Sequence, residues 1–470
     1  MKVGLIVKTG ATAVTLLAIT VVVLLFRPDS FNSRLAAQNS KVLCSAVFVS
    51  GRNLDEAYQN SVGTKLSGDR FERFENGVRF RSLGATRTSI FTECQGCIAL
   101  PEGVDAFAFQ PTCPVGQPDT VPLPRNIDEA LQQGIVDQFA STGAHVATLV
   151  IQHGAVIAEH YADGFDAASK FESWSMGKSL TAALIGRLIQ QGRLTLHQKA
   201  PISEWAGDAR ADITIAHLLN MSSGLKFTRN IGTLRTILTG GGNHGWIYHG
   251  ASDVFDYSIG APAEFGPNEV TRYRNSDPLV LGAIIRRTVE AAGENYLEWP
   301  QSALFDKLGT NGFMLETDIH GNFILTGYDY GTADAWARLG LLFLQRGEWQ
   351  GEQLIPEEFV NFVQTPATAP TFDFPFGSYG GQFWLDPYGD GEGGDGESGD
   401  DVQFPHDAYY MNGLGGQWVV IVPSRNAVIV RFGHTTTSWW QPVEELMKMI
   451  DETLAASDGV RGQSKVRSDG

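Results

Sequence analysis

Apolar and polar positions alternate along the chain with periods that predict a mixed fold. Two apolar stretches, 145–151 and 155–161, flank the turn Gln152-His153-Gly154 and predict two strands. Near the C-terminus, the apolar stretches 417–422 and 427–432 flank turn-forming residues and predict a hairpin. The remaining pattern predicts helices at Asp128–Phe139, Met176–Gln191, Ile215–Asn220, Pro278–Ala291, Ala333–Arg346 and Pro442–Ala455. These elements predict an α/β (α+β) domain whose sheet is built from both of its ends and covered by helices.

Residues 28–124 differ from this domain and predict a separate N-terminal extension. Ala46–Val49 resembles a short strand, and Val78–Arg81 alternates apolar and charged residues, as a half-buried strand does. Proline and glycine at 113–116 and 121–124 indicate a linker. No chemistry is assigned to this extension from its sequence.

The first 27 residues predict a signal anchor or a signal peptide. Lys2 and Lys8 precede an uncharged stretch, Thr9–Phe26, which Arg27 ends. The stretch is close to the shortest that spans a bilayer as a helix. We favour an uncleaved anchor, because the small residues at 35–37 lie far from the apolar core for a cleavage site. The chain after Arg27 is then outside the cytoplasm, which predicts a bacterial envelope protein, anchored in the inner membrane and facing the periplasm, or secreted to the periplasm.

Composition limits the classes of partner that we expect for this protein. The 470 residues are 43% hydrophobic and carry a net charge of −17, which argues against nucleic acid and against an anionic lipid surface as the main partner. Residues 389–401 are rich in Gly, Asp and Glu and predict a solvated insertion rather than a calcium loop, and 456–470 form a polar tail.

Four cysteines in the first quarter of the chain predict disulfides, provided that the compartment is oxidising. We expect Cys44–Cys97 with Cys94–Cys113. A Cys94–Cys97 bond would close too small a loop to stabilise much.

Ser175 and Lys178 form the first part of a candidate active site. Both lie in Ser-Met-Gly-Lys, where a predicted helix begins. A serine here has its side chain near the free amides of the helix N-terminus, and a lysine three residues later returns to the same face. In a desolvated pocket the neutral amine accepts the proton of the hydroxyl. The alternative is a serine that caps the helix and an exposed lysine.

Two further motifs supply groups that such a site needs. Tyr273 and Asn275 lie in a loop before the helix at Pro278–Ala291, where the phenol shares the proton with the lysine and protonates the leaving group, while the amide binds the lysine or the substrate. The glycine-rich stretch 413–417 leads into a strand, and a main-chain amide there completes an oxyanion hole with the amide of Ser175. The alternatives are a buried tyrosine with a turn asparagine, and an ordinary turn.

The order and spacing of the three motifs resemble the penicillin-recognising, β-lactamase-like serine hydrolases. The stretch Asp212–Leu225 is similar to a characteristic segment of their class C branch, and Tyr273–Asp277, Leu281–Ile285 and Thr332–Gly340 also match the family. The resemblance covers residues 130–455. It implies a β-lactamase/DD-peptidase-like domain at 125–455, with an antiparallel sheet flanked by helices and a helical subdomain.

The third motif departs from the class C pattern. Class C β-lactamases carry Lys-Thr-Gly there, whereas this chain has Met411-Asn412-Gly413 and no cation. Gly-Leu-Gly-Gly-Gln instead resembles the 6-aminohexanoate-dimer hydrolase branch, which contains amidases and esterases. That resemblance implies an oxyanion site at Leu414 and Gly415, and gives Lys178 and Tyr273 the roles of base and proton carrier.

These observations predict a serine hydrolase that cleaves a small amide or ester through an acyl-enzyme on Ser175, without a cofactor. The histidines show no metal-ligand spacing. The alternative from another class is a non-catalytic, penicillin-binding-like sensor or binding protein of the cell envelope. The oligomeric state and the biological substrate stay open, and the membrane is expected as a partner through the N-terminal segment only.

Overall fold

The computed structural model describes residues 30–434 except 64, 117–120, 143–144, 229–244, 246, 249–251, 372–377 and 386–404. The predicted anchor, the acidic insertion, the helix at Pro442–Ala455 and the polar tail lie outside the described residues. The chain forms two compact units. Of the described residues, those within 1–111, 227–257 and 317–321 belong to the first unit, and those within 112–226, 258–316 and 322–434 belong to the second.

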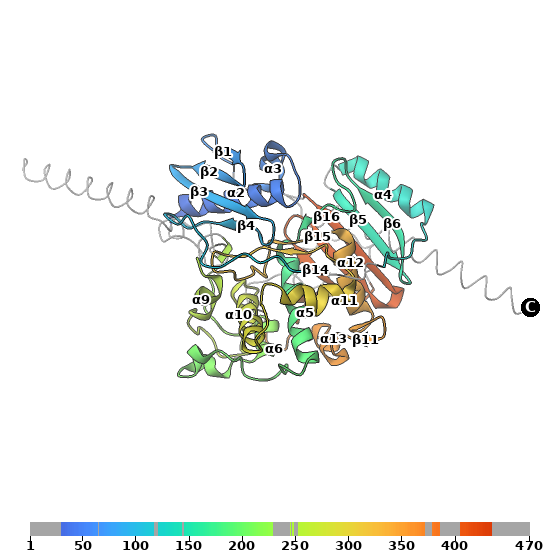
Figure 1. Cartoon of the computed structure of the whole chain (residues 1–470). Coiled ribbons are helices and arrows are strands. Elements are labelled where there is room, and N and C mark those ends of the chain that lie inside the picture. Colours follow the sequence, from blue (N-terminus) through green and yellow to red (C-terminus); the bar gives the residue numbers. More distant parts are fainter. Residues whose placement is uncertain are drawn as a thin grey trace, which may run out of the picture. The chain divides into compact units, whose positions relative to one another are not determined.

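The first unit packs helix α2 (Phe31–Phe48) against a four-stranded antiparallel sheet (Figure 1). The strands follow each other in chain order as β1 (Arg70–Phe74), β2 (Gly77–Ser82), β3 (Ala85–Thr92) and β4 (Gly96–Ala99). A shorter helix, α3 (Leu54–Ser61), packs beside α2. The strand predicted at 78–81 is confirmed, because these residues belong to β2 and alternate between buried and exposed.

The strand predicted at Ala46–Val49 is wrong, because these residues lie at the end of α2. The helix begins after Ser30, whose hydroxyl accepts a hydrogen bond from the amide of Ser33. Ala36, Leu43 and Ala46 are spaced by seven and three residues and pack in one buried cluster with the sheet. A helical period over eighteen residues therefore outweighs the strand preference of a four-residue apolar run.

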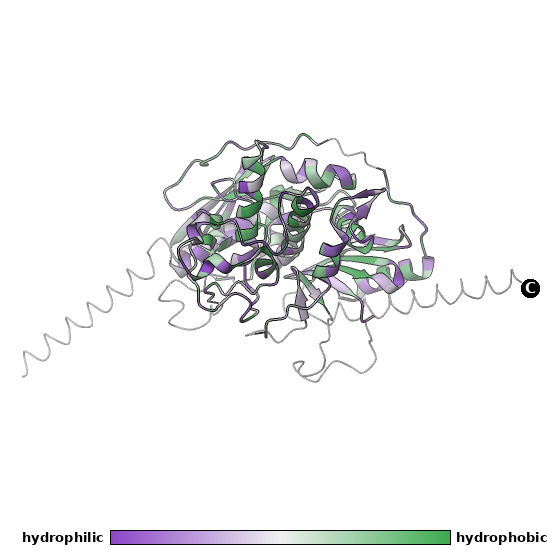
Figure 2. Ribbon diagram, turned by 90° about the horizontal axis from the view of Figure 1, so that it is seen from below, coloured by the Kyte–Doolittle hydropathy of each residue, from purple (hydrophilic) through white to green (hydrophobic). Residues whose placement is uncertain are grey.

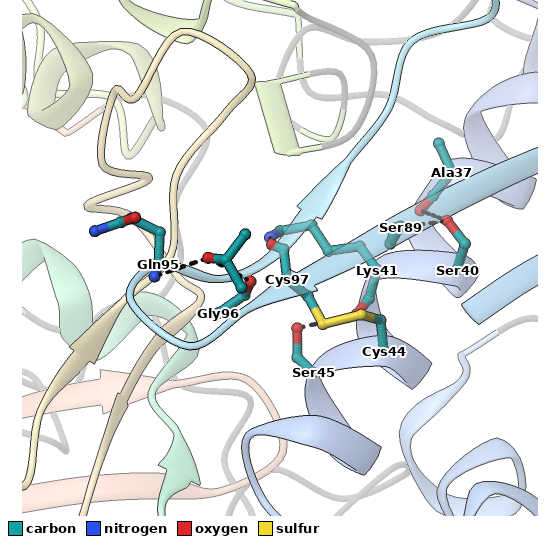
Figure 3. The surroundings of a disulfide bond; sticks show 10 residues. Ala37, Ser40, Lys41, Cys44, Ser45, Ser89, Gln95, Gly96 and Cys97 are labelled. Atoms are coloured by element: carbon teal, nitrogen blue, oxygen red, sulfur yellow. Dashed lines mark hydrogen bonds between the residues drawn. A yellow bond between two sulfur atoms is a disulfide. The ribbon is translucent and has the colours of Figure 1, made fainter. Parts of the chain in front are cut away.

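A disulfide between Cys44 and Cys97 joins α2 to β4, as predicted (Figure 3). Cys94 and Cys113 are also disulfide-bonded, as the second predicted pair requires. Near the bond, the buried amine of Lys41 donates a hydrogen bond to the carbonyl of Cys97. The helix is thus fastened to the sheet by a covalent bond and by buried polar contacts.

The second unit is built around a seven-stranded sheet in which every adjacent pair is antiparallel. Its order is β12 (Ser378–Gly380), β13 (Phe383–Leu385), β14 (Tyr409–Gly413), β15 (Gln417–Val422), β16 (Ala427–Gly433), β5 (His145–Gln152) and β6 (Ala155–Tyr161). The pairing of β16 with β5 joins strands that are almost 300 positions apart. The predicted antiparallel sheet from both ends of the domain is therefore confirmed.

Helices cover both faces of this sheet. Leu131 of α4 (Glu129–Thr142) packs in one cluster with Val150 and Val420, whereas Gly340 of α12 (Ala333–Leu344) lies against Val419 of the other face. Because both faces are covered, the central strands are almost continuously apolar, and hydrophobic colours predominate along them in Figure 2.

The remaining helices of the second unit gather around α5 (Gly177–Gln190). α10 (Ser276–Ala291) packs against both α5 and α6 (Ile215–Leu219), and the shorter helices are α11 (Asp306–Leu308) and α13 (Glu357–Val363). A small sheet has the order β7 (Phe171–Glu172), β9 (Asp329–Gly331) and β8 (Met314–Leu315), and β10 (Glu348–Trp349) pairs with β11 (Glu352–Gln353). Helix α9 (Val254–Ile259) lies between α6 and α10 along the chain. Among the described residues, no helix is long and apolar enough to cross a membrane.

We predict that replacing both Cys44 and Cys97 by alanine destabilises the first unit by about 2–5 kcal/mol, because the unfolded chain is no longer restricted across their 53-residue separation. Hydrogen exchange of peptides from α2 and β4 should accelerate by the corresponding factor. Exchange that stays at the rate of the parent protein, or a non-reducing peptide map that links Cys94 to Cys97, would contradict the assignment.

Candidate active site

The nucleophile turn connects the small sheet to helix α5. Strand β7 ends at Glu172, a single 3₁₀ turn (η1) covers Trp174–Met176, and α5 begins at Gly177. Trp174 has a φ of +44°, an uncommon conformation for a residue with a side chain. Ser175 therefore lies at the N-terminal end of a helix, as its sequence position predicts, and its amide is one of those left free by the helix.

Lys178 is held against Ser175 in the interior. Its amine lies 3.0 Å from the Ser175 Oγ and donates a second hydrogen bond, 3.1 Å long, to the carbonyl of Thr326. The side chain is 1% exposed. Burial lowers the pKa of Lys178 to about 7, and the charge of Asp329 opposes this shift. A large fraction of the amine is then neutral near pH 7 and able to accept a proton.

Tyr273 lies beside the same amine. The amine of Lys178 is 4.9 Å from the centre of the Tyr273 ring. The ring packs against Trp384 and Tyr379, with ring centres 5.2 Å and 5.7 Å away. The loop that carries Tyr273 is tied down by a hydrogen bond from the amide of Arg272 to the carbonyl of Met221. The structure therefore brings the first two predicted motifs together.

Asn275 follows on the same loop and is fully buried at the start of α10. Between the two, Arg274 is also fully buried and donates to the backbone carbonyls of Arg272 and Leu225. Its guanidinium lies 3.8 Å from the carboxylate of Asp277. Arg274 and Asp277 therefore hold the loop from the protein interior, and neither side chain is exposed to solvent.

The third motif reaches the nucleophile from strand β14. Gly413 lies so close to the nucleophile turn that a Cβ on it would be 2.0 Å from the carbonyl oxygen of Ser173. Leu414, at the tip of the turn between β14 and β15, is 44% exposed, and Gly415 has a φ of +86°. A glycine at 413 therefore lets the turn approach Ser175, and a glycine at 415 lets it reverse.

Two buried side chains hold this turn. The side-chain amide of Gln417 donates hydrogen bonds to the main-chain carbonyls of Leu414 (3.1 Å) and Gly433 (2.7 Å). Its oxygen accepts one from the main-chain N–H of Gly433. Arg431 donates to the carbonyl of Gly416 and to His145. Burial, together with the charge of Arg431, lowers the pKa of His145 to about 3, so His145 stays neutral and accepts this hydrogen bond.

Sequence patterns did not identify these supporting groups. Thr326 and Asp329 lie about 150 residues from Lys178, in a segment without a motif. Gln417 belongs to a recognised motif, but its role as a brace depends on Gly433, a partner on the neighbouring strand. Among the described residues, no group of three or more His, Cys, Asp or Glu side chains is arranged to hold a metal ion.

The chain belongs to the β-lactamase family, because residues 134–444 match the family model described as Beta-lactamase. It is similar to the 6-aminohexanoate-dimer hydrolase of Paenarthrobacter ureafaciens, with 24% identity over 275 residues. The match covers 55% of this chain and 66% of that protein, slightly less than two thirds of its length. The family and this relative support a hydrolase.

Solved structures are similar to this chain in fold. One is a proposed 6-aminohexanoate-dimer hydrolase from Bacillus anthracis, with a TM-score of 0.58, 18% identity, and coverage of 73% of this chain and 90% of that one. Another is a penicillin-binding protein homologue from Caulobacter crescentus, with a TM-score of 0.52, 16% identity, and coverage of 71% and 100%. The resemblance stated from the motifs is therefore confirmed at the level of the family and its fold.

Because the pKa of Lys178 is lowered to about 7, we predict that the reaction of Ser175 with a fluorophosphonate accelerates as the pH rises. Below pH 7 the amine is protonated and cannot accept the serine proton, whereas above pH 7 it is neutral. The labelling rate should increase about tenfold between pH 6 and pH 8, as one ionisation near 7 requires. Ser175→Ala is the unlabelled control, and a rate independent of pH over this range would contradict a neutral lysine base.

We also predict that Gln417→Ala slows this labelling by a factor between about 10 and 1,000, because the turn that carries the amide of Leu414 loses its brace. Gln353→Ala is a matched control, since Gln353 also bridges two backbone carbonyls, those of Arg346 and Ile355. Equal rates in the two variants would mean that the turn does not take part in the reaction.

Proposed function

We propose that the protein is a serine hydrolase that cleaves a small amide or ester through an acyl-enzyme formed on Ser175. The observation that carries the proposal is the 3.0 Å contact between the Ser175 hydroxyl and the buried amine of Lys178, beside the ring of Tyr273. A hydroxyl, a neutral amine and a phenol in one pocket are sufficient for acyl transfer without a cofactor.

In the proposed first half of the reaction, the Ser175 Oγ attacks the carbonyl carbon and its proton passes to the Lys178 amine, with Tyr273 beside it. The amides of Ser175 and Leu414 stabilise the negative oxygen of the tetrahedral intermediate. The carbon–nitrogen or carbon–oxygen bond then breaks, and the proton passes through Tyr273 to the leaving amine or alcohol. Asn275 binds the substrate or the lysine.

The second half reverses these proton transfers. Water attacks the acyl carbon and gives its proton to the same lysine and tyrosine, the bond to the Ser175 Oγ breaks, and the serine regains its proton. The products are a carboxylic acid and an amine or alcohol, so the atoms balance without any further reactant.

The acyl side of the substrate is proposed to be uncharged or weakly polar. Met411 is buried and Asn412 is neutral, so the third motif supplies no cation. The two arginines of the facing loop are held by other groups: Arg274 by buried carbonyls, and Arg272 by an ion pair of 2.8 Å to Glu264. We therefore propose a linear amide or ester rather than a β-lactam, because a β-lactam presents a carboxylate and the third motif has no cation to hold it. The relative from Paenarthrobacter is named as a 6-aminohexanoate-dimer hydrolase.

A non-catalytic binding protein of the cell envelope is the alternative from another class. The pairing of Ser175 with a lysine whose pKa is lowered to about 7 favours the enzyme, since a sensor that only binds has no need for a neutral amine at this place. The envelope location is itself a proposal, supported by the disulfides and by the apolar segment before Arg27.

We predict that short p-nitrophenyl esters or linear amides are cleaved with kcat/KM values about one to two decades above that for nitrocefin. One charge-assisted hydrogen bond to the β-lactam carboxylate is missing, which corresponds to roughly 1.5–3 kcal/mol. The substrates are compared on one purified sample, and the Ser175→Ala protein defines the background. Turnover of nitrocefin that equals or exceeds that of the best ester and amide would refute this substrate preference.

A further inference from the structure

One carboxyl group that belongs to none of the three motifs lies against the first turn of helix α5. Asp329 is fully buried and begins strand β9, and its carbonyl accepts a 3.0 Å hydrogen bond from the amide of Ser173. Its side chain lies over Gly177, where an added Cβ would be 1.8 Å from the Asp329 Oδ2. The third residue of Ser-Met-Gly-Lys is therefore a glycine because the carboxyl group occupies the place where a side chain would begin.

The residues just before Asp329 follow the same turn, and we name 325–329 the clamp segment. The carbonyl of Thr326 accepts a hydrogen bond from the Lys178 amine, and the carbonyl of Leu325 accepts one, 2.9 Å long, from the hydroxyl of Thr181. The ring of Tyr328 lies 5.5 Å from that of Trp174. The clamp segment thus contacts residues on both sides of Ser175, as well as the lysine.

Building on the proposed function, we propose that Asp329 is a positioning residue for the Ser175–Lys178 pair. Its carboxylate holds the first turn of α5 in place and supplies the negative charge that stabilises the lysine cation formed when Ser175 gives up its proton. A carboxylate at the N-terminal end of a helix is itself stabilised by the helix dipole.

The electrostatic surroundings of Lys178 support this role. Burial lowers its pKa, and the carboxylate of Asp329 is the charged group that opposes this effect. Among the described residues, the hydroxyl of Ser175, the carbonyl of Thr326 and the ring of Tyr273 also face the amine. On the loop that carries Tyr273, the opposite charges of Arg274 and Asp277 are paired with each other.

Asp329→Asn tests the proposal, because it keeps the shape of the side chain and removes its charge. The pH dependence of fluorophosphonate labelling should move to lower pH by about one unit or more, since an opposite charge that favours the lysine cation is lost. The rate on the alkaline plateau should fall at least several-fold. Glu316→Gln is the matched control. Glu316 is equally buried, and its main-chain amide donates to the carbonyl of Tyr328 in the clamp segment, but the charged group that opposes the lowered pKa of Lys178 is Asp329.

A second variant protects the test against misfolding. Gly177→Ala adds a methyl group where the carboxyl group of Asp329 lies, and so displaces that group. The pH dependence should again move to lower pH. Thermal unfolding is recorded for each protein. A folded Asp329→Asn protein whose pH dependence is unchanged, with or without a lower rate, would overturn the proposal and leave Asp329 a purely structural role.

Failure of the proposed function is distinguishable from failure of this inference. If the parent protein is not labelled at any pH, Ser175 is not an activated nucleophile. The ionisation of Lys178 is then followed directly through the ¹³Cε resonance of labelled lysine, assigned by its loss in Lys178→Arg. A midpoint that moves to lower pH in Asp329→Asn supports the inference, and an unchanged midpoint overturns it.

Discussion

The removal of one amine from water is the interaction on which the chemistry of the second unit depends. A lysine in solvent is protonated at neutral pH and is no base, but the amine of Lys178 is buried beside Ser175 and its pKa is lowered to about 7. That state needs a rigid, dry surrounding, and almost the whole of helix α5 is buried. The nucleophile and the base therefore lie within four consecutive residues, Ser175 in the 3₁₀ turn and Lys178 in the first turn of α5.

The rest of the unit brings distant parts of the chain to that turn. The seven-stranded sheet uses strands from both ends of the domain, so that the turn after β14 arrives beside Ser173, which follows β7. The loop before α10 places Tyr273 against Lys178. Arg274 of the same loop is buried and donates hydrogen bonds to backbone carbonyls. The clamp segment, which leads into strand β9, adds Asp329 and the carbonyl that Lys178 binds. Two of these approaches need a glycine: Gly413 lies against the carbonyl of Ser173, and Gly177 lies against the side-chain carboxyl group of Asp329.

Much of this arrangement is predictable from the sequence, because it depends on local patterns. Strands β5, β6, β15 and β16 and the main helices follow from their apolar periods, and Ser175 at a helix start follows from the pattern of the α5 residues. The family follows from the order of three motifs. Ala46–Val49 fails as a strand because four apolar residues carry no information about the helix that contains them.

The groups that the sequence does not predict are those whose role depends on a partner far along the chain. The sequence does not distinguish Asp329 from the other aspartates, because its role depends on its contact with Gly177. The role of Gln417 likewise depends on its hydrogen bond to the carbonyl of Gly433 on the neighbouring strand. His145 has no sequence signal at all, because its lowered pKa results from burial beside Arg431. Such contacts are properties of the tertiary structure.

The central claim is that turnover passes through an acyl group bound to Ser175. The most direct measurement is the mass of the peptide that contains Ser175, taken after the protein is mixed with a slowly hydrolysed p-nitrophenyl ester and quenched in acid within its first turnovers. We predict an added acyl mass on Ser175 that is absent in Lys178→Ala. A protein that hydrolyses the ester while Ser175 stays unmodified, or that carries the acyl group on another residue, would contradict the account.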